Sequence, residues 1–170
     1  MFWKATSFNQ QLCGAAWVKS KAVKTSMFAG SAAHMCTPSF ASEDAFKRAV
    51  VTCLKLFPQG HCPNSPSGSI QDWDVSSITD MAKLFGDASY FNADISRWEV
   101  SSVKRMNAMF MGAASFNGDF SKWDVSSVID MSGMFWGASS FNGDLSKWDV
   151  SSVAAMSRMF SDAISFNGDI

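Results

Sequence analysis

FNGDLSKWDVSS, residues 141–152, is the stretch that decides the fold, because the chain contains it more than once. It recurs almost unchanged as FNGDFSKWDVSS at residues 116–127, and more loosely as FNADISRWEVSS at residues 91–102. Equivalent residues lie 25 positions apart each time. A fixed period of this length indicates a repeat architecture in which each copy is one structural unit.

Four copies of the repeat fill residues 70–170 without insertion or deletion. Four series of large side chains keep the 25-residue spacing: Trp73, Trp98, Trp123, Trp148; Phe91, Phe116, Phe141, Phe166; Met81, Met106, Met131, Met156; Phe85, Phe110, Phe135, Phe160. The chain has 15 Phe, 11 Met and 7 Trp but only 1 Tyr, as expected when a few positions are copied many times. Hydrophobic residues make up 47% of the chain, so a packed core is feasible.

One copy, residues 145–169, predicts a strand followed by a helix. Leu145, Trp148 and Val150 have the spacing of a short strand, with Trp148 and Val150 on one face. Ser151 and Ser152 suit a helix N-cap, because a serine oxygen accepts the unpaired amide hydrogens of a first turn. The apolar residues that follow have the spacing of one helical face: Val153, Met156, Met159 and Phe160. The pair Asn167-Gly168 then predicts a tight turn.

A unit of this size cannot bury its own core, but it can when it is stacked on a neighbouring unit. We therefore predict an α/β repeat fold, a leucine-rich-repeat-like solenoid of about four strand-helix coils with a helical N-terminal cap. Methionine and aromatic residues replace much of the usual leucine.

The helical cap is predicted from residues 42–57, SEDAFKRAVVTCLKLF. Ser42 is the expected N-cap, and Glu43 and Asp44 suit the positive end of the helix dipole. Pro58 and Gly60 end the helix. The expected apolar face consists of Ala45, Ala49, Val50, Cys53, Leu54 and Phe57.

The chain is expected to have three parts. Residues 1–9, MFWKATSFN, match residues 134–142, MFWGASSFN, at seven of nine positions. Residues 1–36 are therefore expected to be the degenerate tail of an upstream repeat, residues 37–69 a helical cap and loop, and residues 70–170 a four-repeat solenoid. We expect the chain to be a fragment or an incomplete gene product whose uncapped C-terminal coil favours self-association.

Charge and hydropathy exclude several classes of protein. Residues 1–69 carry a net charge of +5 and residues 70–170 a net charge of −6. Neither part has the basic stripe that a phosphate backbone requires, so nucleic acid is not an expected partner. No apolar stretch approaches the length of a transmembrane segment, and the N-terminal residues do not have the pattern of a signal peptide.

The repeat resembles that of the BspA-like leucine-rich-repeat surface proteins, through the string W-D-V-S-S-V-x-x-M-x-x-M-F-x-x-A-x-x-F-N-x-D. The residues in register are Trp123, Val125, Val128, Met131, Met134, Phe135, Ala138, Phe141, Asn142 and Asp144. The resemblance covers residues 70–170 and implies an extracellular or cell-surface location with a binding or adhesion role.

All four cysteines precede the repeats: Cys13, Cys36, Cys53 and Cys62. In a surface context, a disulfide between Cys53 and Cys62 that closes the helical cap is the favoured interpretation. Zinc is an alternative, because His34, Cys36, His61 and Cys62 are suitable donors, but their spacing is not that of a zinc finger. Free buried thiols are the third interpretation.

No catalytic arrangement can be built across the repeated surface. The only histidines are His34 and His61, and both lie outside the repeats. Cys62 next to His61 is weak evidence for a nucleophile, because neighbours in sequence seldom point at each other. The chain is therefore not expected to be an enzyme, and no cofactor is expected.

Two acidic columns are the main candidate sites on the repeats. The first is Asp94, Asp119, Asp144 and Asp169; the second is Asp74, Glu99, Asp124 and Asp149. In one interpretation the first column accepts turn amides, and the basic residues at positions 97, 122 and 147 neutralise the second column. In a weaker alternative, the first column binds Ca²⁺.

A third interpretation, compatible with both, makes the outward face a binding surface. Its candidate residues are Arg97, Glu99, Lys122, Asp124, Lys147 and Asp149, to which we add Trp136, an aromatic where other copies have Gly86, Met111 and Ser161. The expected function is a non-catalytic binding or adhesion module that recognises protein or glycan. A structural spacer is the alternative, and an ice- or mineral-binding serine array is a minor one.

Overall fold

The structure is a computed structural model that describes residues 11–12, 34–35, 40–62 and 69–170. The chain forms two compact units, residues 1–38 and residues 39–170. Most of residues 1–36, the predicted tail of an upstream repeat, lies outside the described residues. The boundaries predicted for the three parts of the chain stay predictions.

The described residues of the first unit form one pair of parallel strands. Strand β1 (Gln11–Leu12) pairs with β2 (His34–Met35), with Gln11 opposite His34. Each strand has two residues, so the pair is only one short ladder.

The helix predicted over residues 42–57 is present as α2 (Glu43–Leu56). Its N-cap is Ser42, whose hydroxyl oxygen accepts a hydrogen bond from the amide of Ala45 at 3.1 Å. Glu43 and Asp44 lie in the first turn, where the helix dipole favours negative charge. The residues that determine where this helix begins are therefore its own cap and first turn, which is why its start could be predicted from the sequence.

Helix α2 packs on the first copy of the repeat. Phe46 is fully buried, and its ring centroid lies 6.2 Å from that of Trp73 and 5.7 Å from that of Trp98. Phe46 was not part of the apolar face that we predicted. At the N-terminal half of α2, Glu43 accepts hydrogen bonds from the amide of Thr79 at 2.9 Å and from its hydroxyl at 2.6 Å.

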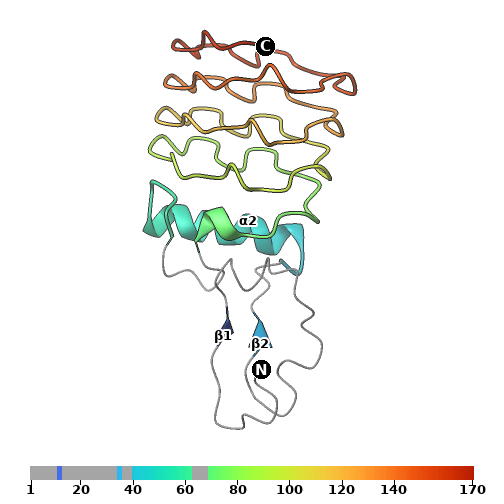
Figure 1. The fold of residues 1–170 in the computed structure, drawn as a ribbon. Helices are drawn as coiled ribbons and strands as arrows, with labels where there is room; N and C mark the ends of the chain where they lie inside the picture. Colours follow the sequence, from blue (N-terminus) through green and yellow to red (C-terminus); the bar gives the residue numbers. More distant parts are fainter. Residues whose placement is uncertain (1–10, 13–33, 36–39, 63–68) are drawn as a thin grey trace. The chain divides into compact units, whose positions relative to one another are not determined.

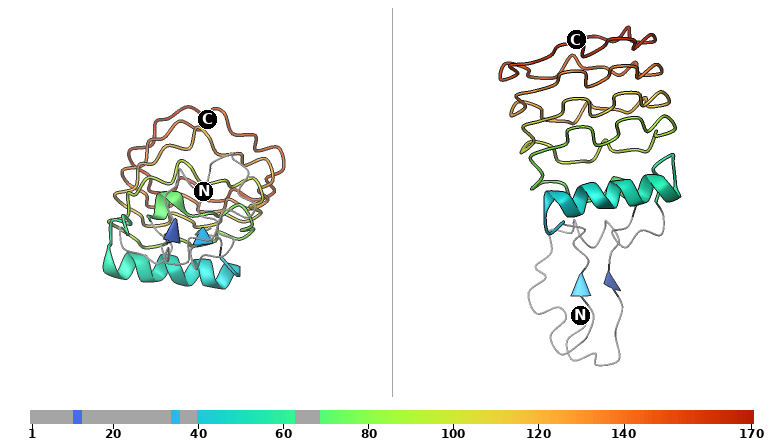
Figure 2. Two further views of the ribbon diagram at one scale, coloured as in Figure 1. Left: turned by 60° about the horizontal axis from the view of Figure 1, so that its bottom comes forward. Right: turned by 180° about the vertical axis from the view of Figure 1, so that it is seen from behind.

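The four copies of the repeat form a stack of flattened coils (Figures 1 and 2). We name them coil 1 (residues 70–94), coil 2 (residues 95–119), coil 3 (residues 120–144) and coil 4 (residues 145–169), and together the coil stack. Coil 1 begins with the short 3-10 helix η1 (Ile70–Asp72). Isolated parallel bridges join equivalent residues of successive coils: Asp80 to Arg105, Arg105 to Asp130, and Asp130 to Ala155.

The backbone of coils 1 to 3 alternates between two kinds of hydrogen bond. In coil 1 the amides of Met81, Lys83 and Phe85 donate to carbonyls of coil 2, at 2.9 Å, 3.0 Å and 2.9 Å. The intervening amides of Leu84 and Gly86 instead donate within the coil to the carbonyl three residues earlier, at 3.2 Å and 3.1 Å. Every second amide is thus bound to the next coil, and the others close successive turns.

This pattern corrects the predicted fold class. In the described residues α2 is the one α-helix and β1 and β2 are the named strands, so the coils are not strand-helix units and the leucine-rich-repeat-like solenoid prediction is wrong. The segment predicted as a helix is a run of turns in each copy. In coils 1 to 3 alternate amides are bound to the next coil and cannot reach the carbonyl four residues earlier, and in coil 4 alternate carbonyls accept the amides of coil 3. The Trp148–Val150 segment lies between two turns, closed at 2.9 Å and 3.0 Å, and is not a strand.

The core of the coil stack is a double column of phenylalanine rings. Along one column, the centroids of Phe85 and Phe110 lie 5.5 Å apart, and those of Phe110 and Phe135 lie 5.6 Å apart. Within each coil, a ring of this column stacks on a ring of the second column, for example Phe135 on Phe141 at 4.0 Å. All four of these rings are fully buried.

Among the described residues, no helix is both long enough and apolar enough to cross a membrane. The prediction that these residues contain no transmembrane segment agrees with this finding.

Candidate functional site

The first acidic column is built into turns. In coils 1 to 3 an aspartate Oδ1 accepts the amide hydrogen of the serine two residues later: Asp94 from Ser96 at 2.9 Å, Asp119 from Ser121 at 2.8 Å, and Asp144 from Ser146 at 2.9 Å. Hydrogen bonds from the serine hydroxyl and amide lower the pKa of all three carboxyls. One carboxylate oxygen of each residue therefore serves the fold.

The three aspartates of the second acidic column, Asp74, Asp124 and Asp149, make the same kind of turn. Asp124 Oδ1 accepts the Ser126 hydroxyl at 2.6 Å and its amide at 3.0 Å, and these two bonds lower the pKa of Asp124. Asp149 accepts the Ser151 amide at 3.0 Å, and hydrogen bonds from the Ser151 side chain and amide lower the pKa of Asp149. Ser151 therefore closes a turn with an aspartate. The prediction that it caps a helix is wrong.

These aspartates predict an acid-sensitive fold. Their pKa values are lowered in the folded chain, so they stabilise it above the unfolded pKa of about 3.9, and this contribution is lost as the pH falls through the folded values. We expect the Tm at pH 3 to lie below the Tm at pH 7, by about 2–4 °C for each 1 kcal/mol lost in a chain of this length. The measurement is thermal unfolding from pH 7 to pH 2.5, and an unchanged Tm would contradict the prediction.

The basic residues of the outward face are exposed and mostly unpaired. Arg97 Nη1 lies 4.0 Å from Asp72 Oδ1, whereas Lys122 and Lys147 form no ion pair with a described residue. After the serine hydrogen bonds, the charge of Lys122 helps to lower the pKa of Asp119, and that of Lys147 helps to lower the pKa of Asp144. The positive charges of the two lysines therefore stabilise the carboxylates of the first column. We had predicted that they neutralise the second column.

The structure brings no metal ligands together in the part of the chain that it describes. No group of three or more His, Cys, Asp or Glu side chains lies in a position to hold an ion there. This finding does not support the Ca²⁺ alternative for Asp94, Asp119, Asp144 and Asp169. For the zinc alternative, Cys36 lies outside the described residues, and only the backbone of His34 is described.

Cys53 and Cys62 are joined by a disulfide, with their Cα atoms 5.6 Å apart. Both side chains are buried, and the Cys53 sulfur also lies 3.8 Å from the carbonyl oxygen of Gly60. The loop that follows α2 is therefore tied back to the helix. A disulfide sulfur is not a nucleophilic thiolate, so Cys62 next to His61 does not form a cysteine-histidine site in this state.

Trp136 is half-buried against coil 4. Its indole N–H donates to Asp162 Oδ2 at 2.8 Å, and the Arg158 guanidinium carbon lies 5.5 Å from the ring centroid. The other six candidate residues of the outward face are exposed: Arg97, Glu99, Lys122, Asp124, Lys147 and Asp149. Trp136 therefore lies over the neighbouring coil. The contacts given above for its side chain are with Asp162 and Arg158, which belong to neither acidic column.

One edge of the coil stack carries left-handed backbone at two positions in every coil. The φ values lie between 53° and 69° at Lys83, Asp87, Ala108, Gly112, Gly133, Gly137, Arg158 and Asp162. This conformation favours glycine, because a Cβ crowds the backbone there. The three glycines were a signal in the sequence, whereas the lysine, alanine and arginine gave none.

Lys83→Gly is expected to raise the free energy of unfolding by about 0.5–1 kcal/mol, because it relieves the left-handed strain at an exposed side chain. Glycine already occupies the equivalent position 133. The measurement is urea unfolding, with Lys83→Ala as the control that removes the same charge and keeps the Cβ. Equal stability of the two variants would contradict the role of the backbone.

An asparagine ladder was missed by the sequence-based prediction. The side-chain oxygens of Asn92, Asn117 and Asn142 accept the backbone amides of residues 117, 142 and 167, at 3.0 Å, 2.9 Å and 2.7 Å. We had assigned the Asn-Gly pairs to turns alone. In coil 1 the residue after Asn92 is Ala93, so the asparagine is kept where the turn glycine is not.

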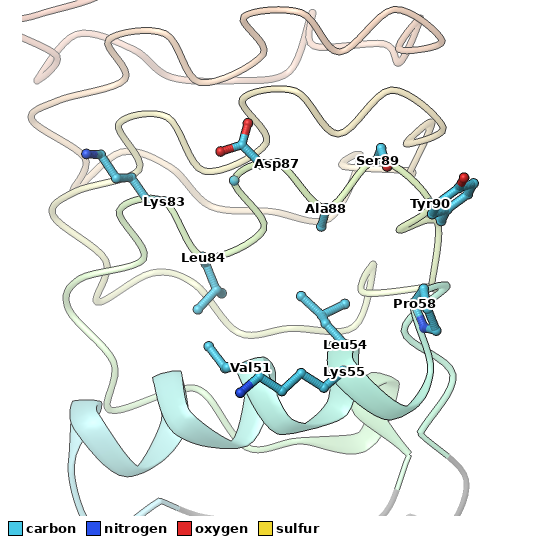
Figure 3. A pocket seen from close by; sticks show the side chains of 11 residues that line it. Val51, Leu54, Lys55, Pro58, Lys83, Leu84, Asp87, Ala88, Ser89 and Tyr90 are labelled. Carbon is cyan, nitrogen blue, oxygen red and sulfur yellow. The ribbon is translucent and has the colours of Figure 1, made fainter.

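A groove between α2 and coil 1 was also missed (Figure 3). We name it the α2 groove; it has a volume of about 390 Å³, and a second pocket of about 500 Å³ adjoins it at Pro58 and Tyr90. Figure 3 shows Leu84 pointing from coil 1 toward Val51 and Leu54 of α2. The groove is lined by Val51, Leu54, Lys55, Pro58, Lys83, Leu84, Gly86, Asp87, Ala88, Ser89 and Tyr90.

A sequence match identifies the family of this chain. Residues 1–39 and 54–170 match the family described as "Mycoplasma protein of unknown function, DUF285", which covers more than half of the chain. The chain belongs to this family. Comparisons of this DUF285 chain with curated proteins and with solved structures find no match.

Membership of the DUF285 family corrects the wider description drawn from the resemblance. The family description names no activity, ligand or partner. Neither this description nor the turn-based coils are evidence for a leucine-rich repeat or for adhesion. Those two descriptions of the chain are therefore dropped.

Proposed function

We propose that the chain is a non-catalytic binding module at a cell surface or in the extracellular space, where it recognises a protein or a glycan. The observation that carries this proposal is the exposed part of the outward face, which we name the charged face of coils 2 to 4. It consists of Arg97, Glu99, Lys122, Asp124, Lys147 and Asp149. Lys122 and Lys147 have no ion-pair partner among the described residues. One oxygen of each neighbouring aspartate makes the turn bond, and the other remains available to a partner.

The regular spacing of these charges supports recognition of an extended partner. The same acid–base arrangement recurs once in each of coils 2 to 4, so several weak contacts form together on a rigid surface. The resemblance of the repeat string to the BspA-like surface proteins supports the location, and assignment to that narrower group is part of this proposal. The Cys53–Cys62 disulfide also supports it, because disulfides persist in oxidising compartments.

The non-catalytic part of the proposal follows from the sequence analysis. In the structure, the Cys62 sulfur that was weighed as a nucleophile is bonded to Cys53. The competing candidate is a structural spacer. It is favoured by the use of the same aspartate turn in coils 1 to 3, which makes the outward face uniform.

The two functions differ in a binding experiment. The full chain is applied to an array of glycans and purified extracellular proteins, beside the double variant Lys122→Ala/Lys147→Ala. The matched control is Lys104→Ala/Arg158→Gly, which removes two positive charges elsewhere and uses residues found at the same positions of other coils. We expect binding to fall at least about fivefold in the first variant and to persist in the control. Absence of binding by the unaltered chain would leave the spacer function.

A further inference from the structure

The α2 groove gathers exposed apolar side chains in one place. Val51, Leu56 and Tyr90 are 51%, 68% and 69% exposed, and all three line the groove or the pocket that adjoins it. Single exposed apolar residues are ordinary on a protein surface. A contiguous group around a concave site is typical of a binding site.

Tyr90 is not required by the repeat. It is the only tyrosine of the chain, and the equivalent positions of the other coils hold Ser115, Ser140 and Ser165. The coils therefore stack without an aromatic side chain at this position. Tyrosine is enriched in protein interfaces because it offers a large rigid apolar area with a polar tip.

The charge of the α2 groove is positive. Lys55 on α2 and Lys83 on coil 1 are exposed, and neither forms an ion pair with a described residue. Asp87 is the single carboxylate among the residues that line the groove. The groove therefore complements negative charge, although residues 70–170 as a whole carry −6.

The aliphatic side chains that line the groove favour a peptide ligand over a sugar. Leu54 and Leu84 face each other across it, and Pro58 closes one end beside Tyr90 (Figure 3). Aliphatic walls of this kind gain free energy by burying apolar side chains, whereas the hydroxyls of a sugar need hydrogen-bonding partners there. A volume of about 390 Å³ is within the range of ligand pockets, about 300–1,000 Å³.

We propose that the α2 groove binds an acidic-apolar peptide segment of a partner protein. An aromatic or aliphatic side chain of the peptide packs between Leu54, Leu84 and Tyr90, and flanking Asp or Glu side chains pair with Lys55 and Lys83. The proposal rests on the non-catalytic binding role above, and assigns it a second surface that is distinct from the charged face of coils 2 to 4.

The test selects ligands on the full chain under non-reducing conditions. A phage library of short random peptides is selected on the unaltered chain and counter-selected on Tyr90→Ser, which installs the residue that the other coils have at this position. The selected peptides are then labelled with fluorescein, and their affinity is measured by anisotropy. The further variants are Lys83→Gly in the groove and, as a matched control, Arg158→Gly at the equivalent left-handed position of coil 4.

We expect enrichment of peptides in which Asp or Glu lies next to Phe, Trp or Leu. Their affinity is expected to fall at least about tenfold in Tyr90→Ser and about threefold in Lys83→Gly, with a weaker dependence on salt in the latter. Arg158→Gly is expected to bind like the unaltered chain.

Three outcomes would overturn the proposal: no enrichment over Tyr90→Ser, selected peptides that are basic or have no charge preference, or equal affinity in the groove variants and the unaltered chain. Binding of neutral oligosaccharides that is lost in Tyr90→Ser, without peptide binding, would also overturn it. If the groove results are negative while array binding still depends on Lys122 and Lys147, only the groove proposal fails. If the array shows no binding but the peptide series does, the charged face of coils 2 to 4 is excluded instead.

Discussion

Phe120→Ala is expected to lower the free energy of unfolding by about 3–5 kcal/mol, the usual cost of deleting a buried aromatic ring. Phe120 is 1% exposed and lies where the two phenylalanine columns meet the tryptophans of the core. Its ring centroid lies 4.4 Å from that of Trp123, 5.6 Å from that of Phe110 and 5.7 Å from that of Trp148. The alanine would leave a cavity that the hydrogen-bonded coils on either side cannot close.

Phe120→Leu is the control for this prediction. The equivalent positions of the neighbouring coils hold Ile95 and Leu145, so the coil accepts an aliphatic side chain there. We expect a loss below about 1.5 kcal/mol. Both variants are measured by urea unfolding at pH 7 under non-reducing conditions. A loss below about 1 kcal/mol in Phe120→Ala would show that the ring is not part of a tightly packed core.

The inward positions of the coils could be predicted from sequence because they repeat. Phe85, Phe91 and Met81 recur at a fixed spacing, and all three are fully buried. Their local structure could not be predicted in the same way. Apolar residues at i, i+3 and i+4 are consistent with a helix and with successive turns, and the choice is made by amides that bond to residues 24 positions ahead, such as Met81 to Arg105.

The hydrogen bonds made by the polar side chains of the repeat were predicted only in part. The aspartates of the repeat were expected to accept turn amides, and Asp94 and Asp119 do so. Asn92 was not singled out, because its hydrogen bond reaches the amide of Asn117 in the next coil and leaves no local signal. The sequence does contain one indication of this bond. The asparagine is present in both copies, although the residue after it is Ala93 in one and Gly118 in the other.

The α2 groove could not be predicted from the sequence, because it exists only where α2 lies against coil 1. Helix α2 itself was predicted from its caps, but the contact of Phe46 with Trp98 was not. The one signal in the sequence was Tyr90 at a position where other copies have serine. Departures from a repeat are therefore informative about function, whereas its constant positions are informative about packing.

Gly60→Ala is expected to lower the free energy of unfolding by about 2–4 kcal/mol, as the sum of backbone strain and overpacking. Gly60 has a φ of +87°, which disfavours any side chain. A Cβ at this position would lie 2.5 Å from Phe91 Cε2 and 3.0 Å from Ala93 Cβ. Phe91 cannot move aside easily, because it is fully buried and its ring stacks on that of Phe85 at 3.9 Å.

Gly86→Ala separates this steric effect from a general cost of replacing glycine. Residue 86 does not have a positive φ, the nearest atom to an added Cβ is the Lys83 carbonyl oxygen at 3.3 Å, and other coils place Met111 and Trp136 there. We expect a change within about 0.5 kcal/mol. Urea unfolding of both variants, with the Cys53–Cys62 disulfide verified by mass spectrometry, makes the comparison. Equal losses would mean that Phe91 yields to the added methyl group and that the contact between the loop after α2 and coil 1 is looser than the structure indicates.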